Sequence, residues 1–456
     1  MNFSNSTLSS LFHAYDIRAL DSDFPPDFFF LLGYSFCKFL NAKSIVVGRD
    51  FRRTSYTYQK EFIDGALAYG TNVEDIGEIA TEMLYFATGS NTNYDGGAVI
   101  TASHNPSGWN GCKLCSKGAD AISETSGLKE IATILNNLDL NSIKNSKAEG
   151  TLKVRNIWPE FRLKILSFLE GVELKPLKIC VDAGNGIGGK VFDYIFSDLP
   201  ITIEKMYFEL DDRFPNHEAD PMKFENVQEL IQKVNSNKYD LGIALDGDSD
   251  RAFFVTKDGK NPTGAYTGAV LAKELLKKNK GCKIVHDPRV IWPIAKEVLK
   301  AGGVPIVSKA GHSFFKEVMS KEEALFGAEM SSHFFYRDFY NADSGMLTCA
   351  LIIRYISEGL DFNAEINQLY STYHISGEHN YTVENPDDII NKLEIEYSNG
   401  DVEHIDGLSV SFQDWRFNLR KSNTQPLIRL NVEAVTEELV AAKLKELEDK
   451  LLRTKV

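Results

Sequence analysis

Three carboxylates at alternate positions mark the segment DGDSDR, residues 246–251, as a candidate metal site. Asp246, Asp248 and Asp250 directly follow an apolar stretch over Leu241–Leu245. Carboxylates this close repel one another unless a cation neutralises them, and their oxygens suit a hard ion such as Mg²⁺. The Gly and Glu that an EF-hand loop requires are absent at the matching positions. The segment therefore predicts a Mg²⁺ site, with a solvated acidic turn as the alternative.

A serine in a second polar segment could carry the group that such a metal activates. Ser103 lies in TASHNP, with His104 beside it, after the apolar stretch Gly97–Ile100. A serine hydroxyl transfers phosphate poorly unless a base or a metal polarises the group in transit. Taken alone, the segment is more typical of a plain β-turn than of a catalytic loop. Because Mg²⁺ commonly binds a phosphate oxygen, the acidic segment favours Ser103 as a phosphoryl carrier.

Two further polar segments suit a phosphorylated sugar. Glu329, Ser331 and His333 follow the apolar stretch Leu325–Ala328 and offer hydrogen-bonding groups for sugar hydroxyls, although each alone is an ordinary surface residue. The segment RKSNTQP, residues 420–426, combines a guanidinium, hydroxyls and an amide, which suits a dianionic phosphate; a plain hairpin loop is the alternative. With a net charge of −14, the chain needs such a local cationic pocket to gather an anionic substrate.

The apolar stretches before these segments predict the elements that position them. Each of the three stretches before TASHNP, DGDSDR and Glu329 has an earlier apolar partner stretch in the chain. These partners are, in the same order, Ser44–Val47, Leu177–Val181 and Lys283–Val285. Short apolar runs that alternate with helices, such as the amphipathic Pro221–Asn237, predict mostly parallel sheets covered on both faces. Ligands of such sheets bind beyond the carboxyl ends of the strands, where the polar segments would lie.

The pattern changes after about residue 370. Alternating polarity over Leu408–Phe412, Trp415–Leu419 and Leu427–Val432 predicts antiparallel strands, and a final helix is expected over Glu437–Leu452. We therefore predict an α/β protein of three similar mixed α/β/α sandwich domains plus a C-terminal antiparallel α+β domain around a central cleft. The predicted boundaries are 1–150, 151–256, 257–370 and 371–456.

Two other motifs are interpreted as structural. GNGIGG, residues 184–189, fits a dinucleotide fingerprint and nearly fits a P-loop, but Val191 replaces the hydroxyl residue that binds Mg²⁺, so we predict a strand-to-helix turn. Cys112 and Cys115 form a CxxC with no second pair to complete a zinc site, and we expect incidental half-buried thiols.

The composition excludes several classes of protein. Hydrophobic residues make up 43% and charged residues 25% of the chain, which is typical of a globular protein. The acidic charge disfavours nucleic acid and anionic membranes as partners. The chain has neither a recognisable signal peptide nor a membrane span, and its six cysteines are scattered, so a cytoplasmic location is expected.

Together, the four segments resemble the α-D-phosphohexomutase family, specifically its phosphomannomutase/phosphoglucomutase branch. The resemblance runs from Tyr15-Asp-Ile-Arg18 to RKSNTQP and matches the family's phosphoserine, metal, sugar and phosphate loops in order. It implies that a phosphate on Ser103 completes the Mg²⁺ site of the three aspartates. The implied catalytic residues are Ser103, His104, Lys113, His333 and Arg18. The implied substrate contacts are Tyr15, Arg251, Arg289, His312, Glu329, Ser331, His333, Arg420, Ser422, Asn423, Thr424 and Arg429.

The implied activity interconverts mannose 6-phosphate and mannose 1-phosphate through phospho-Ser103 and a hexose 1,6-bisphosphate, which is both intermediate and activator. The loop around Met330 resembles members that act on mannose and glucose phosphates, so a phosphoglucomutase or a dual enzyme stays open. A serine-based phosphatase and a non-catalytic sugar-phosphate-binding protein also stay open as alternatives. The sequence does not decide whether Lys113, His333 or Arg18 carries the proton. The last domain is expected to close over the sugar and exclude water, in a monomer or a homodimer.

Overall fold

The computed structural model describes residues 5–144, 150–421 and 427–453 and divides the chain into two units. The first unit comprises Met1–Asn261 and His333–Leu360, and the second comprises Pro262–Ser332 and Asp361–Val456. None of the helices in the described ranges has the length and apolar composition needed to cross a membrane.

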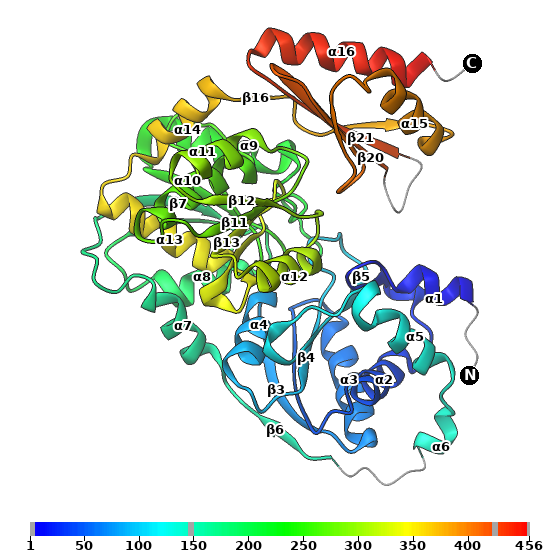
Figure 1. The fold of residues 1–456 in the computed structure, drawn as a ribbon. Coiled ribbons are helices and arrows are strands. Elements are labelled where there is room, and N and C mark those ends of the chain that lie inside the picture. Colours follow the sequence, from blue (N-terminus) through cyan, green and yellow to red (C-terminus); the bar gives the residue numbers. More distant parts are fainter. Residues whose placement is uncertain (1–4, 145–149, 422–426, 454–456) are drawn as a thin grey trace. The chain divides into compact units, whose positions relative to one another are not determined.

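A six-stranded sheet organises the N-terminal part of the first unit (Figure 1). Its strands, in spatial order, are β1 (Ile17–Leu20), β5 (Trp109–Ser116), β4 (Gly96–Ile100), β2 (Ser44–Arg49), β3 (Asn72–Glu78) and β6 (Leu152–Val154). Strands β4, β2, β3 and β6 are parallel, and β5 runs antiparallel to both of its neighbours. The predicted strands at Ser44 and Gly97 are therefore confirmed as the parallel centre of this sheet.

Helices cover both faces of this sheet. Helices α2 (Phe28–Leu40), α3 (Ser55–Tyr69) and α5 (Lys129–Asn136) contribute to one large apolar core, while α4 (Thr81–Ser90) packs on the other face. The alternation is visible at the start of β4, where a Cβ on Gly96 would meet Phe36 of α2 and one on Gly97 would meet Leu84 of α4. Two short helices, α1 (Asn5–Leu11) and α6 (Leu140–Lys144), complete this part.

The second sheet of the first unit carries the acidic segment. Its order is β10 (Ala252–Thr256), β9 (Leu241–Leu245), β7 (Lys178–Asp182) and β8 (Thr202–Met206). Strands β7, β8 and β9 are parallel, and β9 and β10 are antiparallel. The remaining elements are α7 (Trp158–Ser167), α8 (Gly188–Phe196), α9 (Phe224–Lys233), the hairpin β14 (Phe334–Tyr336) with β15 (Ala342–Asp343), and α13 (Gly345–Glu358). Helix α9 confirms the amphipathic segment but begins three residues after Pro221.

The second unit contains a parallel sheet followed by an antiparallel one. Strand β11 (Lys283–His286) pairs in parallel with β12 (Val304–Val307) and β13 (Phe326–Ala328). The helices of this part are α10 (Gly264–Lys278), α11 (Trp292–Lys300), α12 (His312–Glu322) and α14 (Phe362–Thr372).

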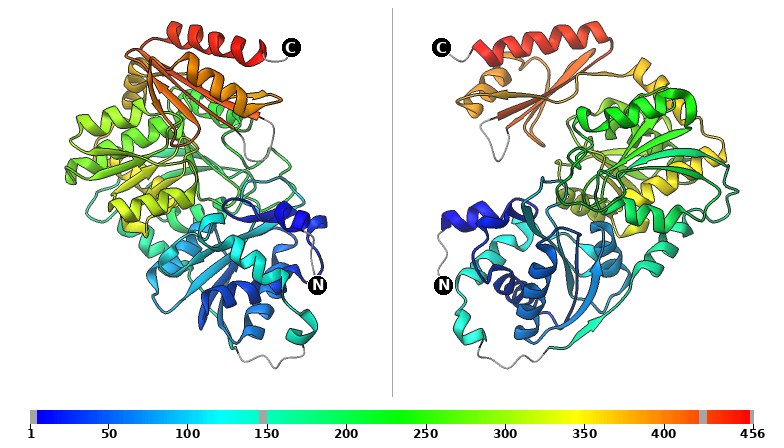
Figure 2. Two further views of the ribbon diagram at one scale, coloured as in Figure 1. Left: turned by 45° about the vertical axis from the view of Figure 1, so that its right-hand side comes forward. Right: turned by 180° about the vertical axis from the view of Figure 1, so that it is seen from behind.

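The predicted C-terminal strands and final helix are confirmed. The strands are β16 (His374–Ile375), β17 (His379–Thr382), β18 (Asp401–Glu403), β19 (Leu408–Ser411), β20 (Trp415–Lys421) and β21 (Leu427–Ala434). All of their pairings are antiparallel. Helices α15 (Pro386–Glu396) and α16 (Glu437–Arg453) cover one face of this sheet (Figure 2), where Phe417, Leu430 and Val432 are fully buried.

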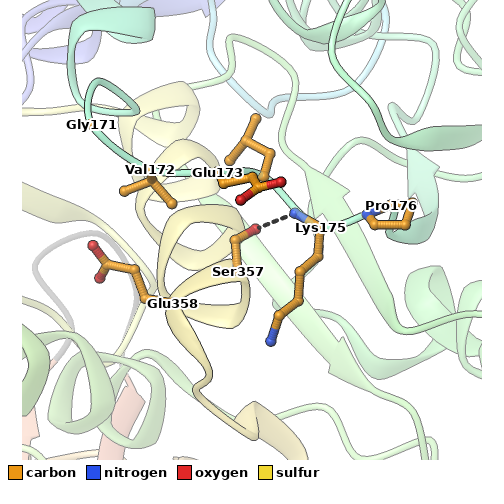
Figure 3. Close-up of a pocket in the computed structure, with 8 residues that line it drawn as sticks. Gly171, Val172, Glu173, Lys175, Pro176, Ser357 and Glu358 are labelled. Carbon is orange, nitrogen blue, oxygen red and sulfur yellow. Dashed lines mark hydrogen bonds between the residues drawn. The ribbon is translucent and has the colours of Figure 1, made fainter.

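A surface pocket of about 430 Å³ lies in the first unit, between the loop after α7 and the end of α13 (Figure 3). Its lining includes Val172, Lys175 and Ser357, and the Lys175 backbone N–H donates a hydrogen bond to Ser357 Oγ at 3.2 Å. None of the predicted site residues lines it, so the pocket is separate from the chemistry that the sequence predicts.

The crossing of α2 and α3 yields a stability prediction. A Cβ on Gly65 would lie 1.9 Å from the Phe30 carbonyl oxygen, so Gly65→Ala forces the helices apart. We expect a loss of about 1–3 kcal/mol in the free energy of unfolding, although alanine normally favours a helix over glycine. Urea unfolding checks this, with the exposed Lys60→Ala in the same helix as the control. An unchanged midpoint for Gly65→Ala would contradict the close packing.

Candidate active site

Ser103 lies in the loop after β4 and is held in an uncommon backbone conformation. Its φ of 54° places it in the left-handed region, and its backbone N–H donates to Thr101 Oγ1 at 2.9 Å. The Ser103 hydroxyl donates to Asp248 Oδ1 at 2.8 Å and lies 3.3 Å from His104 Nδ1. The predicted serine and the predicted metal segment, 145 residues apart, therefore meet.

A buried arginine that the sequence did not single out fixes this loop. The Arg52 guanidinium donates to the carbonyl oxygens of Ser103 at 2.8 Å, Asn105 at 2.6 Å, Pro106 at 3.0 Å and Trp109 at 3.1 Å. Its remaining nitrogen, Nε, lies 3.2 Å from Asp50. All of the guanidinium nitrogens thus face the loop or its counter-ion.

The three aspartates form a buried cluster in the turn between β9 and β10. Asp246, Asp248 and Asp250 are each 2% exposed or less, and carboxylate oxygens of the three lie within 4.8 Å of one another. Lys113 Nζ donates to Asp248 Oδ2 and Asp250 Oδ2, each at 2.6 Å. Arg251 Nε donates to Asp246 Oδ2 at 2.8 Å.

Burial and neighbouring charges shift the pKa values of the groups in this cluster. Burial raises the pKa of the Asp246 carboxyl well above its usual range, and the neighbouring carboxylates reinforce the shift against the opposing Arg251. The pKa of Asp248 lies below its usual range despite burial, because Lys113 is close and Thr81 and Ser103 also donate to it. Burial lowers the pKa of Lys113, but Asp248 and Asp250 outweigh it and hold the ammonium charged.

The cluster fits a divalent cation. Three carboxylates against Lys113 and Arg251 leave one formal negative charge in a buried place, where an unpaired charge is costly. Asp250 Oδ1 is buried and makes no hydrogen bond with the described residues. Mg²⁺ prefers hard oxygen ligands, and Asp250 Oδ1 is an oxygen without a hydrogen-bond donor among the described residues. Asp246, Asp248 and Asp250 could therefore hold Mg²⁺.

Side-chain and backbone contacts that the sequence could not reveal support the metal segment. Thr81, at the start of α4, donates through Oγ1 to Asp248 Oδ2 at 2.6 Å. The Ile187 N–H, in the GNGIGG turn, donates to the Gly247 carbonyl oxygen at 3.2 Å. A Cβ on Gly186 would lie 2.9 Å from that same oxygen, and one on Gly247 would lie 2.5 Å from the Ser103 carbonyl oxygen. The glycine turn is therefore a strand-to-helix turn that braces the acidic segment.

The other predicted residues of the first unit gather around this cluster. Arg18 donates to Asn105 Oδ1 at 2.6 Å and pairs with Asp16, and Tyr15 precedes them in the same segment. His333 forms a β-bridge with Arg251, and its Nε2 lies 3.7 Å from Asp250 Oδ1. Burial lowers the pKa of His104 well below its usual range.

Two acidic groups near His333 escaped the sequence interpretation. Asp343, at the end of β15, places a carboxylate oxygen within 4.8 Å of ligand atoms of Asp250 and His333. Glu82 is fully buried in α4 and accepts hydrogen bonds from the Ser344 hydroxyl and from Met346 N at 3.2 Å. Glu82 stands before the apolar run Met83–Phe86, and Asp343 lies between Ala342 and Ser344; neither belongs to a polar segment that directly follows a predicted strand. By contrast, Cys112 and Cys115 are fully buried rather than half-buried, and a strand holds Lys113 between them.

The predicted sugar contacts of the second unit surround two carboxylates. Asp287 accepts from Arg289 Nη2 at 2.7 Å and from the Met330 N–H at 2.8 Å. Glu329 accepts from Ser331 Oγ at 2.9 Å and from the Gly311 N–H at 2.5 Å. His312 is the first residue of α12, directly after Gly311, so it belongs to the same group.

The predicted phosphate contacts are two paired arginines. Arg420 and Arg429 lie opposite each other on β20 and β21, and each guanidinium lies 3.2 Å from a different oxygen of Glu378. The Nε atoms of both arginines are buried and make no hydrogen bond with the described residues. Such donors suit phosphate oxygens. Ser422, Asn423 and Thr424 lie outside the described residues.

The structure thus groups the predicted residues into two sets, one in each unit. The first unit holds Tyr15, Arg18, Ser103, His104, Lys113, Asp246, Asp248, Asp250, Arg251 and His333. The second unit holds Arg289, His312, Glu329, Ser331, Arg420 and Arg429.

Comparison with known proteins identifies the family to which this chain is similar. Sequence families described as phosphoglucomutase/phosphomannomutase, alpha/beta/alpha domains I, II and III and C-terminal domain, match residues 9–142, 160–259, 263–373 and 378–450. A phosphomannomutase of Vibrio cholerae is 38% identical over 93% of this chain and 94% of its own. A protein of Xanthomonas campestris named phosphohexose mutases is 36% identical over 92% and 94%. The crystal structure of a phosphoglucomutase/phosphomannomutase family protein from Burkholderia thailandensis covers 98% of both chains with a TM-score of 0.87 and 29% identity.

The Arg52 contacts predict a large effect on stability. Arg52→Met leaves the carbonyl groups of the serine loop without donors and leaves Asp50 without its partner. We expect a loss of about 3–5 kcal/mol in the free energy of unfolding, since one partner of a buried pair is removed. Arg53→Met, at the exposed neighbouring side chain, is the control and should change stability little. Equal urea midpoints for both variants would show that Arg52 does not hold the loop.

The carboxylate cluster predicts stabilisation by Mg²⁺. Mg²⁺ at about a hundred times its dissociation constant should raise the free energy of unfolding by about 2.7 kcal/mol, because only the folded cluster binds it. Thermal unfolding with and without Mg²⁺ measures this effect. Asp246→Asn should abolish the shift, whereas Asp211→Asn, in a loop of the same domain, should keep it. A shift that survives Asp246→Asn would place the ion elsewhere.

Proposed function

Since the chain belongs to the phosphoglucomutase/phosphomannomutase family, we propose that it acts as a phosphomannomutase, which interconverts mannose 6-phosphate and mannose 1-phosphate. The observation that carries the proposal is the buried Ser103 hydroxyl, hydrogen-bonded to Asp248 inside the three-carboxylate cluster. A hydroxyl in that position is suited to carry a phosphoryl group next to a divalent cation.

The proposed cycle begins with phospho-Ser103. The free O1 or O6 hydroxyl of the bound sugar phosphate attacks the phosphorus, the bond from phosphorus to Ser103 Oγ breaks, and a hexose 1,6-bisphosphate forms. The intermediate then turns over, and Ser103 Oγ takes the other phosphoryl group in the reverse step. The hexose 1,6-bisphosphate thereby also serves as the activator that phosphorylates Ser103.

The residues of the first unit supply the electrostatics of the transfer. Asp246, Asp248, Asp250 and the phosphate on Ser103 would hold Mg²⁺, which neutralises charge on the phosphoryl group. Lys113 brings a further positive charge to the same place. His333, with Arg18 as the alternative, takes the proton that leaves the attacking hydroxyl, whereas Lys113, as a charged ammonium, donates a proton to the departing serine oxygen.

The residues of the second unit would bind the rest of the substrate. Glu329 accepts hydrogen bonds from sugar hydroxyls, and Ser331 accepts or donates them. Arg289 and His312 lie beside these two residues. Arg420, Arg429, Ser422, Asn423 and Thr424 bind the phosphate that does not react. The buried Nε donors of Arg420 and Arg429 support this assignment.

Glucose phosphates are the second candidate substrates. The relative named phosphohexose mutases supports activity on more than one hexose. The six cysteines, all within the described residues, form no disulfide with one another, which supports a cytoplasmic enzyme. We propose that it is a monomer or a homodimer.

Replacing Ser103 tests the proposal. Mannose 1-phosphate and glucose 1-phosphate are assayed side by side with catalytic hexose 1,6-bisphosphate, and we expect Ser103→Ala to lower kcat/KM at least about a thousandfold for both sugars, because the carrier atom is lost. Ser107→Ala, at an exposed serine of the same loop, should leave the activity unchanged. The wild-type ratio of kcat/KM values then identifies the preferred sugar.

Two outcomes would overturn the proposal. Mutase activity retained by Ser103→Ala would remove Ser103 as the carrier. Inorganic phosphate released faster than the isomer by the wild type would favour a phosphatase, because the same serine and metal could transfer the phosphoryl group to water.

A further inference from the structure

One polar stripe runs along a single face of β20 and β21. The strands pair Arg420 with Arg429, Asn418 with Asn431, and Arg416 with Glu433. Because side chains alternate along a strand, these pairs share one face, and the apolar residues between them form the core on the opposite face. The stripe therefore joins the predicted phosphate contacts at one end to Arg416 and Glu433 at the other.

Arg416 and Glu433 form a buried ion pair, and each is 1% exposed. Arg416 Nη1 donates to Glu433 Oε2 at 2.5 Å. Since burying a charged pair rarely stabilises a fold more than an apolar pair would, the retention of these charges calls for another role. The contacts of the pair outside its own domain indicate that role.

The pair holds a loop of the preceding domain at two points. Arg416 Nη2 donates to the Pro288 carbonyl oxygen at 3.0 Å. Glu433 accepts from the backbone N–H groups of Ile291 at 2.9 Å and Trp292 at 2.8 Å, where α11 begins. The carboxylate thereby satisfies N–H groups at a helix start, which an anion does well.

The held loop leads directly to the sugar contacts. It carries Asp287, which binds the guanidinium of Arg289 and accepts the Met330 N–H at 2.8 Å. Met330 lies between Glu329 and Ser331, the predicted contacts to sugar hydroxyls. Hydrogen bonds at both ends of the backbone segment 287–292 thus connect the phosphate-binding strands to the sugar loop.

A second connection runs in parallel. Asp406 lies 3.8 Å from Arg420 and accepts the Ala310 N–H at 3.4 Å. The next residue, Gly311, donates its N–H to Glu329. This second connection runs from the phosphate contact Arg420 to Glu329, whereas the first runs from Arg416 and Glu433 to Met330, the residue after Glu329.

We propose that Arg416 and Glu433 are positioning residues that hold the phosphate-binding strands at a fixed spacing from the sugar loop once the last domain has closed over the sugar. A hexose phosphate presents its phosphate and its hydroxyls at a set separation, so a fixed spacing selects for the complete ligand. The proposal rests on the proposed function, because that function identifies the ligand. Both residues are buried, so we assign them no contact with the substrate.

Amide exchange and substrate kinetics of Glu433→Gln test the proposal. This variant keeps the shape of the side chain but removes its charge. We expect the Met330 amide to exchange at least about tenfold faster, because the loop that holds it loosens. The KM for mannose 1-phosphate should rise by about tenfold or more, while inhibition by inorganic phosphate, which needs only the arginines, should change less than about twofold.

Two further variants control the experiment. Glu365→Gln removes the partner of Lys273 in the same unit, far along the chain from both loops, and should change neither quantity. Arg416→Lys keeps the charge but loses the planar fork, so it should fold and show a smaller effect in the same direction. Faster exchange at Ile291 and Trp292, with Met330 exchange and KM unchanged, would reduce the pair to a structural role and overturn the proposal.

The experiment separates this proposal from the proposed function. Wild-type protein without mutase activity would overturn the function, whereas the exchange of the Met330 amide would still test the connection. Active wild type with an unperturbed Met330 amide in Glu433→Gln would overturn the connection alone.

Discussion

Three carboxylates buried in one turn set the main constraint on the first unit. Removing Asp246, Asp248 and Asp250 from water is unfavourable unless cations and donors surround them. The fold supplies these from separate elements: Lys113 from β5, Arg251 from the residue directly before β10 and Thr81 from α4. Two sheets must therefore approach at their loop ends, and the position of Ser103 follows from that approach.

The approach itself depends on backbone groups more than on side chains. Gly247 comes so close to the Ser103 carbonyl that a Cβ would have no room, and Ser103 adopts a left-handed φ. Left-handed backbone costs free energy for a residue other than glycine, and it persists only where contacts determine it. Arg52 provides those contacts, because its rigid fork can bind several carbonyl oxygens at once.

The strands and the polar segments that follow them could be predicted from the sequence, but the residues that hold those segments in place could not. Short apolar runs identified β2, β4, β7, β9, β11 and β13 because a strand buried on both faces has few polar residues. Arg52 could not be recognised, since Arg52-Arg53 is indistinguishable in sequence from two surface arginines. Thr81, Asp343 and Glu378 act through partners far away in the chain, and periodicity contains no information about such pairs. The GNGIGG turn shows the converse, because a motif typical of cofactor binding here serves packing between backbones.

In the second unit, as in the first, buried charges are paired with opposite charges, but here the predicted ligand-binding groups are cationic. In the first unit, three carboxylates form a cluster that could hold a cation. In the second unit, Arg289 is paired with Asp287, and Arg420 and Arg429 share Glu378. A carboxylate that orients a guanidinium keeps its planar fork fixed, so less conformational entropy is lost when an anion binds. Glu378 also offsets part of the positive charge of these arginines, which would weaken the binding of a phosphate in the proposed function. For a cycle in which one intermediate must leave its phosphate site, turn over and bind again, a moderate hold is an advantage, because a site that binds the intermediate too tightly slows the next transfer.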